Sequence, residues 1–288
     1  MKSREELIDD LLTLSFAEDV GDGDATTLST IPADEMGRQR LIVKEEGILA
    51  GVDAARMVFE KFDPSLKMTV HINDGAHVKP GDIAFEVEGP VRSLLQTERV
   101  MLNIMQRMSG IATTTARYQS RLDGLATKVL DTRKTTPGMR LLEKDAVKIG
   151  GGENHRIGLF DMILIKDNHV DFAGGIHNAV ESASKWCKEN GKDLKIEVET
   201  RNEDEIRQAL AENVDRIMLD NFTPERTADA VKIIREDDTR KGRHTEIESS
   251  GGITIDTLRA YGETGVDFIS VGALTHSVKG LDMSFKAY

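Results

Sequence analysis

Three short segments of the chain concentrate positively charged side chains. Arg133 and Lys134 form the first segment, and Lys166 is the third. The second is His155-Arg156, which directly follows three consecutive glycines whose backbone can approach a ligand closely. Arginine binds carboxylates through two parallel N–H groups, so these cations favour a substrate with several negative charges. Each segment alone is also typical of an exposed loop.

Two acidic residues follow predicted strands in the same half of the chain. Glu199 and Asp220 end neighbouring strands, where carboxylates can hold ribose hydroxyls or a hydrated Mg²⁺. Mg²⁺ uses one or two protein carboxylates together with substrate phosphates, so two are sufficient. The alternative is a pair of ordinary loop carboxylates.

Two glycine-rich turns follow the last two predicted strands. Ser249–Gly252 and Gly272-Ala273 would let backbone N–H groups approach a phosphate at helix N-termini. A lone pair of glycines is more often a tight turn, but two such turns on consecutive strands strengthen the prediction. No Walker A loop and no G-x-G-x-x-G follows a strand, which favours a phosphorylated sugar over a nucleoside triphosphate or a dinucleotide.

Six short apolar segments alternate with helical ones in the second half and would position these residues. The strands are predicted at 127–130, 162–165, 194–198, 216–219, 245–247 and 268–271, with helices at 176–190, 202–213 and 224–235. This alternation favours a parallel sheet, and six strands are fewer than a complete (β/α)₈ barrel needs. The carboxyl ends of parallel strands share one rim, where the polar residues are expected to meet.

The first part of the chain has a different pattern. Short strands between residues 38 and 91 and a helix at 52–62 predict a small α/β sandwich. Ser3 and Glu6 have capping-box spacing before a helix, and an acidic turn is predicted at 19–27. A helix at 92–122 carries a methionine stripe typical of a core or subunit interface, and it is expected to connect two domains.

Composition excludes several functional classes. The 50 Asp and Glu outnumber the 38 Lys and Arg and give a net charge of −12, which argues against nucleic-acid and anionic-membrane partners. Cys187 is the only cysteine, so no intrachain disulfide is possible. The first ten residues are too charged for a signal peptide, and no apolar run approaches a membrane span. These observations predict a cytoplasmic protein.

An ordered set of motifs resembles the quinolinate phosphoribosyltransferase family, the decarboxylating enzymes (nicotinate-nucleotide pyrophosphorylase, carboxylating) of NAD biosynthesis. The motifs are Asp131–Gly138, Lys148–Arg156, Leu164–His169, Ile196–Glu199, Leu219–Asn221, Ser249–Ile253 and Val271–His276, with Glu18-Asp19, Gly23-Asp24 and Thr97–Asn103 nearer the N-terminus. The resemblance covers nearly the whole chain.

The resemblance implies a type II phosphoribosyltransferase fold. This is an α/β fold with an N-terminal α/β sandwich at 1–112 and an incomplete α/β barrel at 113–288, whose last residues pack back on the N-terminal domain. It also implies a homodimer, or dimers assembled into a hexamer, in which the N-terminal domain completes the partner's active site.

The resemblance also implies roles for individual residues. The expected quinolinate-binding residues are Arg99 from the neighbouring subunit, Arg133, His155, Arg156 and Lys166. Lys134 is expected to be catalytic and to lie near the pyrophosphate of 5-phosphoribosyl 1-diphosphate. Glu199 and Asp220 are also expected to be catalytic, as the carboxylates that hold the ribose and Mg²⁺, the metal directly or through water. The residues that resemble the family's 5′-phosphate site are Ser250, Gly251, Gly272 and His276.

The implied products are nicotinate mononucleotide, carbon dioxide and pyrophosphate. Nicotinate phosphoribosyltransferase is the nearest alternative, but its substrate has a single carboxylate and the cation cluster favours a dicarboxylate. A phosphosugar lyase or aldolase that uses Lys134 or Lys166 as a Schiff base is a second class. A non-catalytic scaffold is a third, although polar residues at every strand end have little use in one.

Overall fold

The computed structural model describes residues 2–288, which divide into two compact units. The first contains the chain up to Ala116 together with Lys134–Gly151 and Ala273–Tyr288, and the second contains Arg117–Arg133 and Gly152–Gly272. The sequence predicts a single boundary after residue 112. In the structure the chain returns to the first unit twice after leaving it: the return of Ala273–Tyr288 is the expected packing of the last residues on the N-terminal domain, whereas the return of Lys134–Gly151 is not expected.

An antiparallel sheet of order β12-β1-β5-β3 is the centre of the first unit, and β2 and β4 pair separately. The strands are β1 (Met36–Val43), β2 (Gly47–Ile48), β3 (Lys67–Val70), β4 (His77–Val78), β5 (Ile83–Pro90) and β12 (Met283–Ala287). The helices are α1 (Arg4–Asp19), α2 (Ala25–Thr30), α3 (Val52–Phe62), α5 (Arg140–Ile149) and α11 (Ala273–His276). The predicted helix at 52–62 is confirmed as α3.

Three phenylalanines join helix and sheet in the core of this unit. Phe59 of α3 lies 6.1 Å from Phe85 of β5 and 6.0 Å from Phe285 of β12, measured between ring centroids. All three are buried, and such aromatic pairs add about 0.5–1.5 kcal/mol each beyond the area they bury. The last strand of the chain is therefore part of the core of the first unit.

The N-terminal helices begin at side-chain caps. The Ser3 and Glu6 capping box is confirmed, because Ser3 Oγ accepts from the Glu6 N–H and Glu6 accepts from the Ser3 N–H. The acidic turn predicted at 19–27 is only partly right. Asp24 Oδ1 accepts from the N–H groups of Thr26 and Thr27, and this cap starts α2 within the predicted turn.

The long helix α4 (Val91–Ser120) confirms the prediction at 92–122, and it passes from the first unit into the second. Its methionine stripe of Met101, Met105 and Met108 is buried. Gly110 is needed on this helix, since a Cβ there would lie 2.3 Å from the carbonyl oxygen of Lys279. No helix within residues 2–288 combines the length and apolar character required to cross a membrane.

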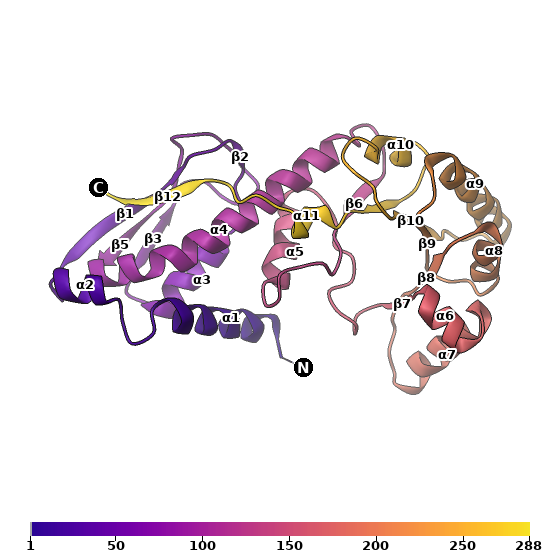
Figure 1. Cartoon of the computed structure of the whole chain (residues 1–288), viewed down its shortest axis with the longest axis horizontal. Coiled ribbons are helices and arrows are strands. Elements are labelled where there is room, and N and C mark those ends of the chain that lie inside the picture. Colours follow the sequence, from indigo (N-terminus) through magenta and orange to yellow (C-terminus); the bar gives the residue numbers. More distant parts are fainter. Residues whose placement is uncertain (1) are drawn as a thin grey trace. The chain divides into compact units, whose positions relative to one another are not determined.

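The second unit contains a six-stranded parallel sheet of order β6-β11-β10-β9-β8-β7 (Figure 1). The strands are β6 (Lys128–Leu130), β7 (Ile163–Ile165), β8 (Ile196–Thr200), β9 (Arg216–Asp220), β10 (Glu246–Ser250) and β11 (Phe268–Ser270). The helices are α6 (Asp167–Ala173), α7 (Ile176–Glu189), α8 (Glu203–Ala211), α9 (Pro224–Lys241) and α10 (Leu258–Gly262). All six predicted strands and the predicted helices at 176–190 and 202–213 are confirmed within a few residues, and the helix predicted at 224–235 continues to Lys241 as α9.

One extra segment extends this sheet beyond β6. Glu153 forms a parallel bridge with Leu130, and the Glu153 N–H donates to the Val129 carbonyl oxygen at 2.8 Å. The residues that follow, His155 and Arg156, therefore enter the unit alongside β6.

Candidate active site

The parallel register places the carboxyl ends of the strands at one rim of the second unit, as the sequence predicts. The residues at or just after these ends are Arg133, Lys166, Glu199, Asp220, Ser250 and Gly272. The rim therefore carries both cations and carboxylates, together with the last glycine-rich turns.

Arg133 and Arg156 belong to one electrostatic cluster in this unit. Burial lowers the pKa of the half-buried Arg156 guanidinium, and the nearby positive charge of Arg133 lowers it further. Glu197 opposes this shift, and its own carboxyl feels the charges of Arg156 and Lys166. Arg156 and Lys166 therefore act on the same buried carboxylate, and Arg133 lies close enough to Arg156 to affect its pKa, an arrangement suited to an anionic ligand.

Lys166 joins the cations to the acidic residues of the rim. Its Nζ lies 2.6 Å from Oε2 of Glu199, which is nearly buried near the end of β8. On the neighbouring strand, Asp220 Oδ2 accepts from Asn221 Nδ2 at 2.8 Å. Both side chains offer the hard oxygen ligands that Mg²⁺ prefers, so their chemistry fits the predicted metal.

Gly251 occupies a position that only glycine can fill. Its φ of +102° is left-handed, and a Cβ there would lie 2.2 Å from Asn221 Oδ1 and 3.0 Å from the Asn221 backbone nitrogen. The Asn221 N–H in turn donates to the Ser250 carbonyl oxygen at 2.9 Å. The predicted phosphate turn is therefore packed directly against the residue that follows Asp220.

A layer of charged side chains is buried below the rim. Arg216 lies opposite Glu197 on β8 and Glu246 on β10 in the strand register, so all three face the same side of the sheet. Arg216 Nη1 lies 3.2 Å from Glu248 Oε2, and Nη2 lies 2.9 Å from Glu246 Oε2. Breaking one partner of such a buried pair typically costs about 3–5 kcal/mol.

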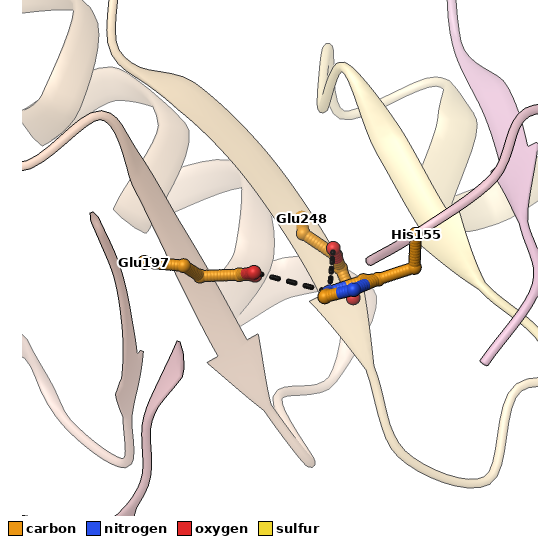
Figure 2. Close-up of side chains that lie close together, drawn as sticks. All are labelled: His155, Glu197 and Glu248. Atoms are coloured by element: carbon orange, nitrogen blue, oxygen red, sulfur yellow. Dashed lines mark ion pairs between the residues drawn. The ribbon is translucent and has the colours of Figure 1, made fainter. Parts of the chain in front are cut away.

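His155 completes this layer. Its Nε2 lies 3.0 Å from Glu197 Oε2 and 3.4 Å from Glu248 Oε2, and the two carboxylates point toward the imidazole ring (Figure 2). The segment that carries His155 lies alongside β6, and β6 is four positions from β8 in the strand order. A flat sheet would separate those strands by about 19 Å at ~4.8 Å per strand. The sheet is therefore strongly curled, as the predicted incomplete barrel requires.

Burial changes the protonation of the two glutamates. It raises the pKa of Glu197 to about 7, although the charge of Arg216 and a hydrogen bond from Glu248 act in the opposite direction. Burial also raises the pKa of Glu248 to about 7, with a further increase from the negative charge of Glu197. Near neutral pH the pair therefore holds protons that exposed glutamates would have lost.

Sequence reasoning missed the roles of Glu248 and Arg216. Glu248 has no predicted role, and Arg216 is predicted only as the first residue of the strand at 216–219. The available signal was the alternation along β8 and β10, since Glu197 and Glu199 share one face, as do Glu246 and Glu248.

Three predicted site residues belong to the first unit. Arg99 is exposed on α4 and has no hydrogen-bond or ion-pair partner within residues 2–288. Lys134 accepts a 2.9 Å hydrogen bond from Thr275 Oγ1 at its backbone carbonyl. His276 Nδ1 lies 2.6 Å from Ser277 Oγ. The structure does not bring these three together with the second-unit residues within one compact unit, and their roles stay predictions.

Models of two protein domains match the chain. "Quinolinate phosphoribosyl transferase, N-terminal domain" matches residues 24–109, and "Quinolinate phosphoribosyl transferase, C-terminal domain" matches residues 111–286. A chloroplastic protein of Oryza sativa subsp. japonica, named nicotinate-nucleotide pyrophosphorylase [carboxylating], is 46% identical over 96% of this chain and 76% of its own. A probable nicotinate-nucleotide pyrophosphorylase [carboxylating] of Bacillus subtilis (strain 168) is 42% identical over 95% of this chain and 91% of its own.

Solved structures agree with these matches. The nicotinate-nucleotide pyrophosphorylase from Francisella tularensis is 41% identical, with a TM-score of 0.90 over 100% of this chain and 98% of that one. Human Nicotinic Acid Phosphoribosyltransferase has a TM-score of 0.60 at 12% identity over 97% of this chain and 74% of that one, which shows a similar fold alone. On the two domain matches and these relatives, the chain belongs to the quinolinate phosphoribosyltransferase family.

Proposed function

We propose that this protein converts quinolinate and 5-phosphoribosyl 1-diphosphate to nicotinate mononucleotide, carbon dioxide and pyrophosphate in NAD biosynthesis. The observation that carries the proposal, beyond family membership, is that Arg156 interacts electrostatically with Arg133, and that Arg156 and Lys166 act on one buried carboxylate, Glu197. Quinolinate has two adjacent carboxylates, and several convergent cations match that charge better than the single carboxylate of nicotinate.

The remaining cation of the quinolinate pocket is Arg99, supplied by a second copy of the chain. Support comes from its exposure on α4 without a partner within residues 2–288, which leaves its guanidinium available to another molecule. A homodimer, or dimers assembled into a hexamer, is the assembly that this requires. Size-exclusion chromatography with light scattering would distinguish these from a monomer.

The phosphoribosyl substrate occupies the rest of the rim. Lys134 lies near the pyrophosphate, and Glu199 and Asp220 hold the ribose hydroxyls and Mg²⁺, directly or through water. The 5′-phosphate is received by the backbone at Ser250, Gly251 and Gly272 and by the side chain of His276. When bound, Mg²⁺ offsets the negative charge that develops on the pyrophosphate leaving group.

The chemistry needs electrostatic stabilisation more than proton transfer. As pyrophosphate leaves ribose C1, positive charge develops on the sugar, and the carboxylates of Glu199 and Asp220 stabilise it. The pyridine nitrogen of quinolinate attacks C1 and becomes a pyridinium. The bond between ring C2 and the 2-carboxylate then breaks, so that carbon dioxide leaves and the electron pair stays on C2 beside the positively charged nitrogen. A proton from water then binds C2 and completes nicotinate mononucleotide. No nucleophile–base pair is required.

A two-substrate assay tests this proposal. Purified protein, MgCl₂ and 5-phosphoribosyl 1-diphosphate are mixed with quinolinate or, separately, with nicotinate. We expect carbon dioxide and nicotinate mononucleotide from quinolinate only. Turnover of nicotinate alone would assign the sister reaction. Product from neither would contradict both and would direct attention to lysine-dependent chemistry, which borohydride trapping detects.

Variants connect the activity to the cation cluster. Arg133→Ala and Lys166→Ala are expected to lose most turnover with quinolinate, because each removes a charge facing the substrate. Arg207→Ala is the matched control, since Arg207 is an exposed arginine of α8 whose ion pair with Glu203 is 3.9 Å long. Unchanged turnover in the first two variants would contradict the assignment of the pocket.

We place this reaction in the cytoplasm. Support comes from the lone cysteine, Cys187, which is a buried free thiol as expected in a reducing compartment. The matched plant protein is named chloroplastic, so fractionation of the source cells is the test. Recovery of the protein in an organelle would contradict this location and leave the reaction itself unaffected.

A further inference from the structure

A buried ion pair of the first unit has no part in the proposed reaction so far. Arg107 of α4 donates from Nε to Glu143 Oε1 of α5 at 2.6 Å, and the Glu143 side chain is completely buried. The guanidinium also donates from Nη2 to the backbone carbonyl oxygen of Thr275 in α11 at 2.9 Å. One arginine therefore joins three helices of the first unit, α4, α5 and α11 (Figure 1).

The segment that directly follows Lys134 is held by side chains of α5. The Thr136 N–H donates to the Glu143 carboxylate, at 3.2 Å from Oε2 and 3.4 Å from Oε1. One residue earlier, Thr135 Oγ1 accepts from Arg140 Nε at 3.0 Å. Residues 134–136 have no regular secondary structure of their own, so these contacts with a helix are what orders them.

A further hydrogen bond connects Lys134 to the residue before His276. Thr275 is completely buried, and its Oγ1 donates to the Lys134 backbone carbonyl oxygen at 2.9 Å. Since Arg107 holds the carbonyl oxygen of Thr275, the ion pair and this hydrogen bond tie the same two segments together. Lys134 and His276 are the residues proposed to bind the pyrophosphate and the 5′-phosphate, so these contacts fix the spacing between two phosphate-binding segments.

Packing alone does not explain why charged side chains lie between these helices. A buried ion pair gains little over well-packed apolar side chains of similar volume, because both charges lose their hydration. Apolar side chains, however, could neither accept from the Thr136 N–H nor donate to the Thr275 carbonyl oxygen, and buried backbone groups need such partners. The ion pair therefore serves the two segments, and its place on α4 and α5 gives them a rigid support.

We infer that Arg107 and Glu143 are positioning residues for 5-phosphoribosyl 1-diphosphate. Their ion pair fixes the distance between the segments of Lys134 and His276, so that one substrate molecule contacts both through its pyrophosphate and its 5′-phosphate. A misplacement of about 1 Å in such a site can cost about 100-fold in rate. The inference rests on the proposed function for the identity of this substrate.

Calorimetry with two separate ligands tests the inference. Inorganic pyrophosphate with MgCl₂ probes the segment of Lys134, and quinolinate probes Arg156 and Lys166 of the second unit. We expect Glu143→Leu to weaken pyrophosphate binding roughly tenfold and to change quinolinate binding by less than about threefold. Equal weakening of both, or an unchanged pyrophosphate affinity, with folding intact by circular dichroism, would overturn the inference.

The conservative variant Glu143→Gln tests the hydrogen bond to the Thr136 N–H. Its amide oxygen can still accept from that N–H, although the negative charge is gone. We expect this variant to bind pyrophosphate within about threefold of the wild type. A loss as large as in Glu143→Leu would show that the affinity does not depend on this hydrogen bond, which would contradict positioning.

Thr275→Val tests the same connection without a change of charge, and it replaces Glu143→Leu if that variant does not fold. It removes the hydroxyl that donates to Lys134 and keeps the shape of the side chain. Thr115→Val is the matched control, because Thr115 is also completely buried and its Oγ1 donates to the Ile111 carbonyl oxygen of its own helix at 2.8 Å. We expect weaker pyrophosphate binding in Thr275→Val than in Thr115→Val, and equal affinities would overturn the inference.

Failure of the proposed function gives a different result. If the wild type binds pyrophosphate but forms no nicotinate mononucleotide from quinolinate, the proposed reaction is wrong, and the pyrophosphate affinities of the variants still test positioning. If the wild type turns quinolinate over and the variants bind pyrophosphate as tightly as it does, the reaction is right and Arg107 and Glu143 serve the fold alone.

Discussion

The raised pKa of the buried Glu248 predicts how the free energy of unfolding depends on pH. Its pKa is about 7 in the folded protein against 4.5 for an ordinary glutamate, so the folded state keeps a proton that the unfolded state has lost. Stability from this group is therefore highest below pH 4.5 and falls as the pH rises to about 7. The loss is roughly 3 kcal/mol, at 1.36 kcal/mol for each pKa unit.

Glu248→Gln removes this titration. The variant also changes the contact with Arg216, so its stability at pH 5 can differ from that of the wild type in either direction. The change in that difference between pH 5 and pH 8 reports the lost titration of Glu248 together with the altered titration of Glu197, whose carboxyl interacts with it. We expect the variant to gain roughly 2.5 kcal/mol relative to the wild type over this range, measured by urea unfolding at each pH.

Glu246→Gln is the matched control, because Glu246 lies on the same strand and pairs with the same arginine. Contacts with Lys195 and Arg216 hold the pKa of Glu246 below its ordinary value despite burial. Stability from a depressed carboxyl is fully present above its unfolded pKa, so this variant should show no trend between pH 5 and pH 8. Parallel curves for Glu248→Gln and the wild type would refute the argument.

Three further predictions concern the rim. Gly251→Ala should cost about 1–3 kcal/mol of stability because the backbone at this position is left-handed. It should also raise the KM for 5-phosphoribosyl 1-diphosphate more than the KM for quinolinate. Equal KM values for the variant and the wild type would contradict the assignment of this turn to the phosphate. Lys166→Met, which keeps the side-chain length and removes the charge, should weaken quinolinate binding by tenfold or more in calorimetry, with the exposed Lys185→Met as control. Removal of divalent metal with EDTA should abolish turnover but change the thermal unfolding midpoint by no more than about 2 °C, because the metal binds together with the substrate. Addition of Mg²⁺ should restore turnover.

Much of the fold can be predicted from the sequence where local pattern determines it. The strands of the second unit are short apolar runs bounded by polar residues, and their alternation with helices indicates a parallel sheet. The strand β12 was not predicted, because its partner β1 lies near the other end of the chain. The segment before α5 was assigned to the barrel, although its backbone belongs to the first unit.

The site residues also divide into those that a local sequence pattern predicts and those that depend on distant contacts. The cations Arg133, Arg156 and Lys166 were found because they follow strands or glycines, which is a local signal. No such local signal predicts the partners of His155. Its contacts with Glu197 and Glu248 depend on how strongly the sheet curls, and no short stretch of sequence encodes that curl.

The pairing of β12 with β1 has a consequence for how the protein is made. On a ribosome, the second unit is complete once Gly272 has emerged, whereas the first unit still lacks its last strand. Until then β1 has an open edge, and Phe285 is missing from the aromatic core. The first unit therefore completes its folding only after β12 has emerged, later than the second unit. A chain truncated before β12 would keep the open edge of β1, which is prone to aggregation.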